Sequence, residues 1–115
     1  MKLYLAKTLI DMKKYGPTYD LSLEPEDRVE TYDFEVEDGE WLLDHVVDGI
    51  NATCDTLLDD GDVDYIGAEY SKNLIDYLSQ LDLENIPDGP RNVITKLIEY
   101  AERAEKYGTG LAIEF

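Results

Sequence analysis

The sequence predicts one small α+β domain over residues 1–115, in which three helices pack on an antiparallel or mixed sheet of three to four strands. Two patterns predict this fold class. Short strand-like segments lie near both ends of the chain, whereas residues 40–107 repeat their apolar positions with a helical period. A hydrophobic content of 43% over 115 residues is enough to close one core. The expected element order is β(β)β-α-α-α-β.

The first quarter of the chain is expected to supply the first strands. Its opening residues alternate polar and apolar side chains, which predicts a strand over 2–6. The pair Gly16-Pro17 signals a turn. A short second strand is expected at 19–23, and the acidic segment 24–27 ends it.

The segment RVETYDFEVE, residues 28–37, is the clearest strand in the sequence. Alternation along it predicts one apolar face, formed by Tyr32, Phe34 and Val36. The opposite face is then polar and mostly acidic, formed by Thr31, Asp33, Glu35 and Glu37. One face of this strand is expected to join the core while the other offers a row of carboxylates to solvent.

Residues 40–59 repeat with a helical period, and Asp38 is expected to cap this helix. Its apolar face consists of Leu42, Leu43, Val46, Val47, Ile50, Cys54, Leu57 and Leu58. The opposite sector carries an acidic stripe, consisting of Glu40, Asp44, Asp48, Asn51, Asp55 and Asp59. Gly49 weakens such a helix slightly.

Two further helices and a last strand complete the expected fold. The second helix runs from Tyr65 or Ile66 to Leu81, and the third covers 91–107. Gly108 ends the third helix as a C′ glycine, and residues 110–115 form a strand that pairs with the N-terminal region. On the third helix, the expected ion pairs are Glu99–Arg103 and Glu102–Lys106. The core is expected to include Phe34, Leu42, Val46, Ile50, Leu57, Leu74, Leu78, Val93 and Leu97.

The negative charge of this chain is concentrated in one segment. Residues 20–69 hold 18 acidic residues and one basic residue, Arg28, whereas acids and bases balance in the rest of the sequence. No Lys or Arg occurs between Arg28 and Lys72. Because like charges repel within a compact fold, this arrangement is expected to lower stability, and a dispersed arrangement would serve solubility equally well. The concentration therefore indicates a binding role.

Composition also limits the classes of partner. A net charge of −17 opposes direct binding to nucleic acid or to an anionic membrane; it favours a cationic partner or metal ions, or else serves only solubility. The sequence has no apolar stretch of transmembrane length and no recognisable signal peptide. Cys54 is the only cysteine, so an internal disulfide is excluded and a cytoplasmic location is expected. The sequence does not indicate the oligomeric state.

No catalytic motif is present, and the chain is not expected to be an enzyme. The segment DDGDVDYIGAEY places Asp60, Asp62 and Asp64 where a calcium-binding loop has its first three ligands. Tyr65 and Ser71 then occupy the positions that require Gly and a bidentate Glu. Neither a metal site nor a cofactor site is predicted.

Partner binding is expected to involve the carboxylate row of the strand at 28–37, the acidic stripe of the helix at 40–59 and the turn that follows them. These carboxylates lie on ordered elements and lack the interspersed Lys and Arg of an ordinary solvated face. Trp41, at the edge of the stripe, either packs at the start of its helix or serves as an aromatic anchor. The predicted partner-binding residues are Asp33, Glu35, Glu37, Glu40, Trp41, Asp44, Asp48, Asp55, Asp59, Asp62 and Asp64.

The favoured hypothesis is an inhibitor, encoded by a phage or mobile element, that mimics nucleic acid. Its carboxylates would meet the Lys and Arg residues with which a host nuclease or defence protein, of the CRISPR or restriction type, contacts phosphates. One alternative is an immunity protein that neutralises a toxin nuclease. Alternatives of another class are a divalent-cation-binding protein and an accessory phage structural protein.

Overall fold

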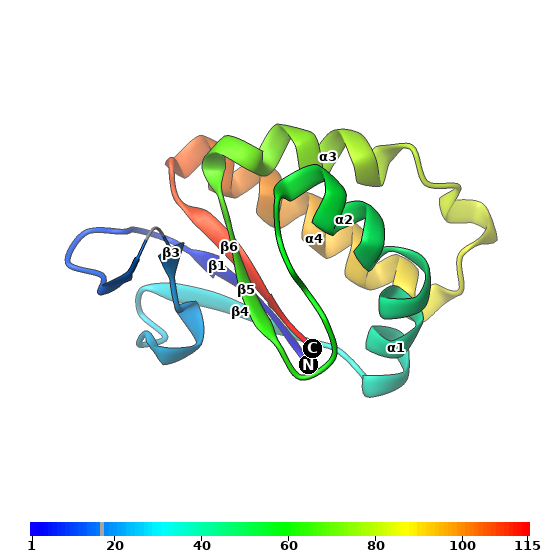
Figure 1. The fold of residues 1–115 in the computed structure, drawn as a ribbon, viewed down its shortest axis with the longest axis horizontal. Helices are drawn as coiled ribbons and strands as arrows, with labels where there is room; N and C mark the ends of the chain where they lie inside the picture. Colours follow the sequence, from blue (N-terminus) through cyan, green and yellow to red (C-terminus); the bar gives the residue numbers. More distant parts are fainter. Residues whose placement is uncertain (17) are drawn as a thin grey trace.

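The protein, described here by a computed structural model of residues 1–16 and 18–115, is built on a four-stranded sheet (Figure 1). Its strands are, in spatial order, β4 (Val29–Asp33), β1 (Lys2–Ala6), β6 (Gly110–Glu114) and β5 (Val63–Gly67). All neighbours are antiparallel, so the α+β class is confirmed. The expected pairing of the two ends of the chain is confirmed as well, because Leu3 of β1 lies opposite Ile113 of β6.

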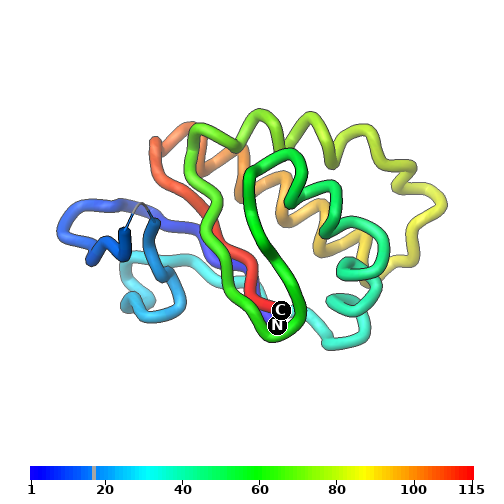
Figure 2. The backbone as a smooth tube through the Cα atoms, viewed as in Figure 1, coloured from blue at the N-terminus to red at the C-terminus, as the bar shows by residue number. Residues whose placement is uncertain are grey.

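The described residues form four α-helices, where three were expected, and these lie on one face of the sheet (Figure 2). They are α1 (Val36–His45), α2 (Val47–Cys54), α3 (Ser71–Ser79) and α4 (Asp88–Tyr107). The longest, α4, packs directly on β1 and β6, and both α1 and α3 pack on α4. No helix in the described part of the chain is long and apolar enough to span a membrane.

Both faces of the sheet are buried, because its strands alternate between two cores. Leu3 and Leu5 of β1 face the helices, whereas Tyr4 and Ala6 face the opposite side. Residues 8–16 and 18–24 cover that second side. They contain the two-stranded hairpin of β2 (Lys14–Tyr15) and β3 (Thr18–Tyr19), followed by a 3-10 turn (Leu21–Leu23).

The expected strand at 19–23 is therefore wrong beyond Tyr19. Asp20 begins a 3-10 turn instead, because its carboxylate accepts a hydrogen bond from the backbone N–H of Ser22 at 3.1 Å. Gly16 lies in the turn of the hairpin with φ of 63°, while its expected partner Pro17 lies outside the described residues.

The strand expected at 28–37 ends at Asp33, so the predicted row of strand carboxylates does not exist. Phe34 N–H still donates to Met1 O at 3.0 Å, but the N–H groups of Asp38 and Gly39 both donate to Glu35 O at 3.1 Å. These bonds start α1, in which Glu35 is the N-cap residue without a side-chain cap. Asp38 is consequently not the cap that the sequence suggested. Acidic residues in the first turn suit the positive end of the helix dipole.

The helix expected over 40–59 is broken at Val46 and ends at Cys54. Val46 has φ of −126° and separates α1 from α2, and Asp55 closes α2 in a left-handed conformation. Tyr77 of α3 donates to Val46 O at 3.2 Å, and its ring lies where a Cβ on Gly49 would be. Gly49 is thus required for close packing of α3 on α2, a reason that its low helix propensity did not suggest.

The second expected helix is wrong at its start, because residues 63–67 form β5 and α3 begins only at Ser71. Ile66 reaches the helix-side core as a strand residue opposite Leu111 of β6. The third expected helix is confirmed as α4, and Gly108 follows it with φ of 68°.

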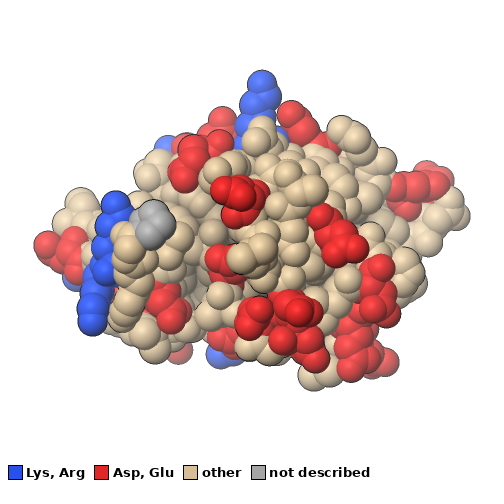
Figure 3. Space-filling view, in the orientation of Figure 1, with Lys and Arg blue, Asp and Glu red and all other residues tan. Residues whose placement is uncertain are grey.

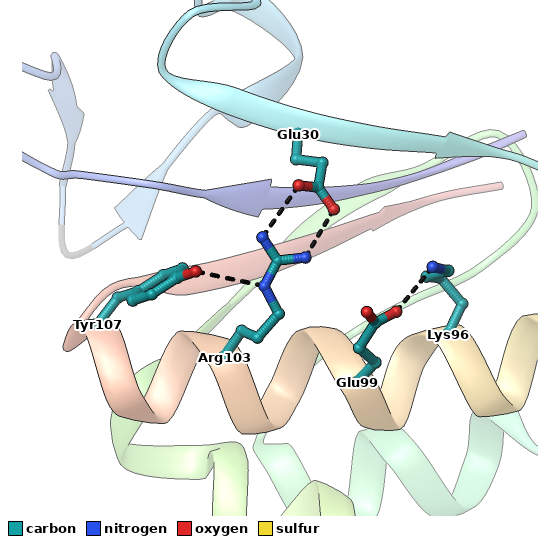
Figure 4. A network of polar contacts seen from close by, with 5 residues as sticks. All are labelled: Glu30, Lys96, Glu99, Arg103 and Tyr107. Carbon is teal, nitrogen blue, oxygen red and sulfur yellow. Dashed lines mark hydrogen bonds and ion pairs between the residues drawn. The ribbon is translucent and has the colours of Figure 1, made fainter.

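The ion pairs of α4 differ from those predicted (Figure 4). Arg103 reaches across to β4 and binds both carboxylate oxygens of Glu30, at 2.7 and 2.9 Å, instead of pairing with Glu99. Glu99 pairs with Lys96 at 2.7 Å, and no Glu102–Lys106 pair forms among the described residues. A bidentate contact between elements is stronger than an exposed pair along one helix, which explains the choice of Arg103.

Candidate partner-binding surface

Acidic side chains gather over α1, α2 and the turn before β5 (Figure 3). There, the two helices and the loop 58–60 enclose an open groove of about 560 Å³. Its acidic lining residues are Glu40, Asp44, Asp48, Asp59 and Asp60, and its apolar lining residues are Leu43, Val47 and Leu58. All five acidic residues are exposed. The groove thus combines apolar walls with a high density of carboxylates.

This combination suits the long cationic side chains. Lys and Arg have apolar stems that pack on hydrocarbon and charged ends that seek carboxylates. In the groove, half-buried Leu43 offers apolar surface to such a stem, whereas Val47 and Leu58 are almost fully buried. Glu40 and Asp44, one helical turn apart on α1, are available to the charged ends. The groove can therefore accept basic side chains of a protein partner.

The loop after α2 is held rigidly although it contains no regular structure. Asn51 of α2 accepts hydrogen bonds from Leu58 N at 2.8 Å and Thr56 Oγ1 at 2.7 Å, and its amide donates to Leu58 O at 3.0 Å. Asp64 of β5 accepts a further bond from Leu57 N at 3.0 Å. Asn51, which the sequence placed on the acidic stripe, is consequently a clamp for this loop.

Leu57 is 86% exposed at the tip of the clamped loop, although it was expected in the core. Its expected burial depended on a continuous helix to residue 59, and the chain leaves the helix at Asp55. Phe34 is half-buried, and the other seven residues of the expected core are buried. Leu57 thus adds an apolar contact point in the middle of the acidic surface.

Beyond this loop, a second depression of about 260 Å³ contains three more acidic residues, Asp55, Asp64 and Glu69. Asp62 lies exposed in the turn before β5, where its carbonyl oxygen accepts a hydrogen bond from Phe115 N at 2.9 Å. The segment 55–60 therefore contributes to two acid-lined depressions, with Asp59 and Asp60 in the groove and Asp55 in the second.

Other predicted partner-binding residues lie away from the groove or already contact other side chains of this chain. Asp33 is on edge strand β4 with Lys2 Nζ at 3.8 Å, and Glu35 and Glu37 are exposed at the start of α1. Trp41 is half-buried against the helix-side core and stacks on His45, with ring centroids 4.2 Å apart. Of the predicted set, Glu40, Asp44, Asp48 and Asp59 come together in the groove.

Few of the acidic residues in the 20–69 segment are neutralised. Within the described residues, Glu30 and Asp33 are the two that have a Lys or Arg within ion-pair distance. The one basic residue of the segment, Arg28, donates to Ile10 O at 2.8 Å instead. The negative potential of this surface is therefore not cancelled from within the chain.

Two candidate groups remain, the Cys54 thiol and the calcium-loop-like segment 60–71. Burial raises the pKa of Cys54 to about 11, so its thiol stays protonated and unreactive at neutral pH. The calcium-loop-like segment forms a turn and then β5, and no cluster of three His, Cys, Asp or Glu side chains suited to a metal occurs in the described chain.

Comparisons with protein-family models, with curated proteins and with solved structures gave no match to this chain.

Asp60 and Leu57 are the residues of the groove region that sequence reasoning missed. Leu57 lies where the helical period was extended too far, and Asp60 lies in the turn after it; no sequence signal other than the Asp59-Asp60-Gly61 turn marks the end of that period.

Proposed function

We propose that this protein is an inhibitor that fills the nucleic-acid-binding cleft of a basic protein. The observation that carries the proposal is the groove between α1, α2 and the loop 58–60, with its five exposed carboxylates and apolar walls. In this mechanism, the carboxylates take the place of phosphates and meet the Lys and Arg residues that normally contact them. Leu57 adds an apolar contact that phosphates do not provide.

Electrostatics would make association fast and sensitive to salt. A carboxylate and a cation 4 Å apart attract by about 1 kcal/mol in water and by about 4 kcal/mol at the effective dielectric constant near a protein surface. Uncancelled charge also steers the two proteins together before contact. These effects need fixed carboxylates, and the helices and the Asn51 clamp provide that rigidity.

The finer form of the proposal is a phage- or mobile-element-encoded inhibitor of a host nuclease or defence protein. The rival form, an immunity protein against a toxin nuclease, uses the same surface. The partner's identity separates the two: a toxin nuclease encoded beside this protein supports immunity, whereas a CRISPR or restriction component supports a defence inhibitor.

The test starts with capture of partners from cell lysate on the immobilised protein at low salt, with elution by rising NaCl. A basic nucleic-acid-binding protein is expected, and DNA or RNA is expected to compete with its binding. Affinity is then measured with the purified partner for the triple variant Glu40→Lys, Asp44→Lys and Asp48→Lys. We expect binding about a hundredfold weaker or worse, because three exposed pairs at about 1 kcal/mol each correspond to roughly two decades.

The matched control changes the same amount of charge elsewhere. Asp76, Glu102 and Glu105 lie exposed on α3 and α4, outside the acidic segment, and are reversed to Lys in the control variant. Circular dichroism checks that both variants fold. Equal losses in both would reduce the effect to net charge and contradict the proposal, as would a captured partner that does not compete with nucleic acid.

A further inference from the structure

On the sheet face opposite the helices, a cavity of about 260 Å³ lies between the β2–β3 hairpin and edge strand β5. Three tyrosines and two aspartates contribute to its walls: Tyr15, Tyr19, Tyr65, Asp20 and Asp64. Its volume is below the range of roughly 300–1,000 Å³ that is typical of small-molecule pockets. It is therefore sized for one long side chain.

The aromatic walls are fixed in position. The rings of Tyr19 and Tyr65 have centroids 5.4 Å apart and are tilted by 60°. The Tyr65 hydroxyl donates to Thr109 O at 3.2 Å, and its ring lies where a side chain on Gly110 would collide. Burial, together with the charge of Glu69 and the ring of Tyr19, raises the pKa of Tyr65 to about 12, so this wall is uncharged.

Two of these rings already attract cations. Lys13 Nζ lies 4.9 Å from the centre of the Tyr15 ring, and Lys14 Nζ lies 5.8 Å from that of Tyr19. Both distances are within the range of roughly 6 Å in which a cation is attracted to a ring face. Since the two lysines are exposed, a better-placed cation can displace them.

The two carboxylates are oriented by the backbone but lack a cation. Asp64 accepts hydrogen bonds from Tyr65 N at 2.9 Å and Leu57 N at 3.0 Å, and Asp20 accepts hydrogen bonds from Ser22 N at 3.1 Å and Ser22 Oγ at 2.5 Å. Both aspartates are half-buried, and neither belongs to an ion pair of the described residues. Asp20 thus adds a fixed negative charge beside the three rings, whereas the Asp64 side chain lies on the Ile66 side of edge strand β5, where Leu57 N holds it.

We propose that this cavity receives the guanidinium group of an arginine side chain. A guanidinium is planar, so it stacks on aromatic rings, and its N–H groups fork toward carboxylates. Lysine has a compact ammonium that is held by water more strongly and does not stack. The inference rests on the proposed function in one respect, since the arginine is taken to belong to the basic protein partner.

The probe is N-acetyl-L-arginine amide, titrated into the isotope-labelled protein and followed by NMR. We expect saturable shifts at Tyr19, Tyr65 and Ala112, with a dissociation constant in the millimolar range. The matched probe N-acetyl-L-citrulline amide has the same shape without the charge and is expected not to bind. Equal shifts with both probes, or shifts spread evenly over the carboxylates of α1 and α2, would overturn the assignment.

Variants of the cavity separate binding from folding. Tyr19→Leu removes a ring face and Asp20→Asn removes a charge, and each is expected to weaken arginine binding at least tenfold. Tyr19→Phe keeps the ring and is expected to bind as the parent protein does. Tyr107→Leu, an exposed tyrosine outside the cavity, is the control. Equal losses in Tyr19→Phe and Tyr19→Leu would contradict a role for the ring face.

The arginine-binding experiments can contradict the cavity proposal without contradicting the inhibitor proposal, and the reverse is also true. The charge-reversed variant of Glu40, Asp44 and Asp48 is expected to bind the arginine probe normally even though its partner binding is lost. If the parent protein binds the probe but captures no basic protein, the cavity assignment stands and the inhibitor proposal falls. If it captures such a protein but does not bind the probe, the reverse holds.

Discussion

Carboxylates in two regions of this molecule have opposite surroundings. Between β4 and α4, Glu30 receives both terminal nitrogens of Arg103, which also donates to the Tyr107 hydroxyl at 3.4 Å, and Glu99 pairs with Lys96 nearby (Figure 4). Along residues 36–64, no carboxylate has a Lys or Arg within ion-pair distance in the described chain. The first region uses charge to join elements, whereas the second leaves its charge to solvent.

The difference teaches how a small protein can carry so much net charge. The acidic helices α1 and α2 are attached to the rest of the fold through apolar contacts, such as those of Leu42, Val46 and Ile50, and not through ion pairs. Within the described chain, the exposed carboxylates of Glu40, Asp44 and Asp48 therefore have no cation partner, whereas Asp38 packs against Gly89 at the start of α4. The cost is repulsion within the surface, and the core and the Glu30–Arg103 pair offset it.

The largest expected effect concerns the apolar attachment of the acidic surface. Ile50 of α2 is 2% exposed and Leu57 is 86% exposed, although sequence reasoning placed both in the core. Ile50→Ala should lower the free energy of unfolding by roughly 2–5 kcal/mol, because it leaves a cavity. Leu57→Ala should change it by no more than about 0.5 kcal/mol. Urea denaturation of both variants measures the contrast, and a similar loss in each would mean that Leu57 is buried in solution.

Sequence patterns predicted those elements of the fold whose local and tertiary signals agree. The strand at 2–6, helix α4 with its terminal Gly108, and the last strand at 110–114 were all recognised. Residues 63–67 were not, because Ile66, Tyr70 and Leu74 continue a helical spacing backwards into a strand. Pairing with β6 decided the structure there, and a single sequence does not contain that information.

The candidate surface was predicted in part for a similar reason. Glu40, Asp44 and Asp48 share a face because the helical period around them is real. The strand row ending at Glu37 was wrong, since α1 starts earlier than its apolar pattern shows. No sequence pattern marked the left-handed conformation of Asp55, at which the chain leaves α2. The turn that follows brings Asp60 into the groove and allows Asn51 to hold the loop.

The next effect tests the region in which charge is compensated. Arg103→Met keeps an apolar stem against the neighbouring tyrosines and removes the guanidinium. We expect a loss of about 1 kcal/mol in the free energy of unfolding, because two charge-assisted hydrogen bonds are lost at a site that is only partly shielded from solvent. Lys96→Met, which removes an exposed pair within α4, should cost less.

Low pH should abolish the stabilisation that the Glu30–Arg103 pair provides. The hydrogen bonds from Arg103 hold the pKa of Glu30 below its ordinary value of 4.5. The folded state therefore binds fewer protons at this site than the unfolded chain does, and the stabilisation is complete above that value and lost as the pH falls through the lowered pKa. Denaturation of the parent protein and Arg103→Met should differ at neutral pH and converge in acid. A difference that persists when Glu30 is protonated would contradict the ion-pair origin.

The smallest expected effect has the opposite sign and concerns the uncompensated region. Glu40 and Asp44 are four residues apart on α1, about 6 Å along the helix axis, with no cation between them in the described structure. A like-charge pair at this spacing costs roughly 0.2–0.5 kcal/mol, so Glu40→Gln with Asp44→Asn should raise the melting temperature slightly.

Raising NaCl from about 0.01 to about 0.15 M shortens the Debye length from roughly 30 to roughly 8 Å, so it should stabilise the parent protein more than this variant. Glu99→Gln is the matched change in the compensated region. It removes the carboxylate that pairs with Lys96, so it should not raise the melting temperature. If Glu40→Gln with Asp44→Asn failed to stabilise the protein, as is expected for Glu99→Gln, the contrast between the two regions would disappear.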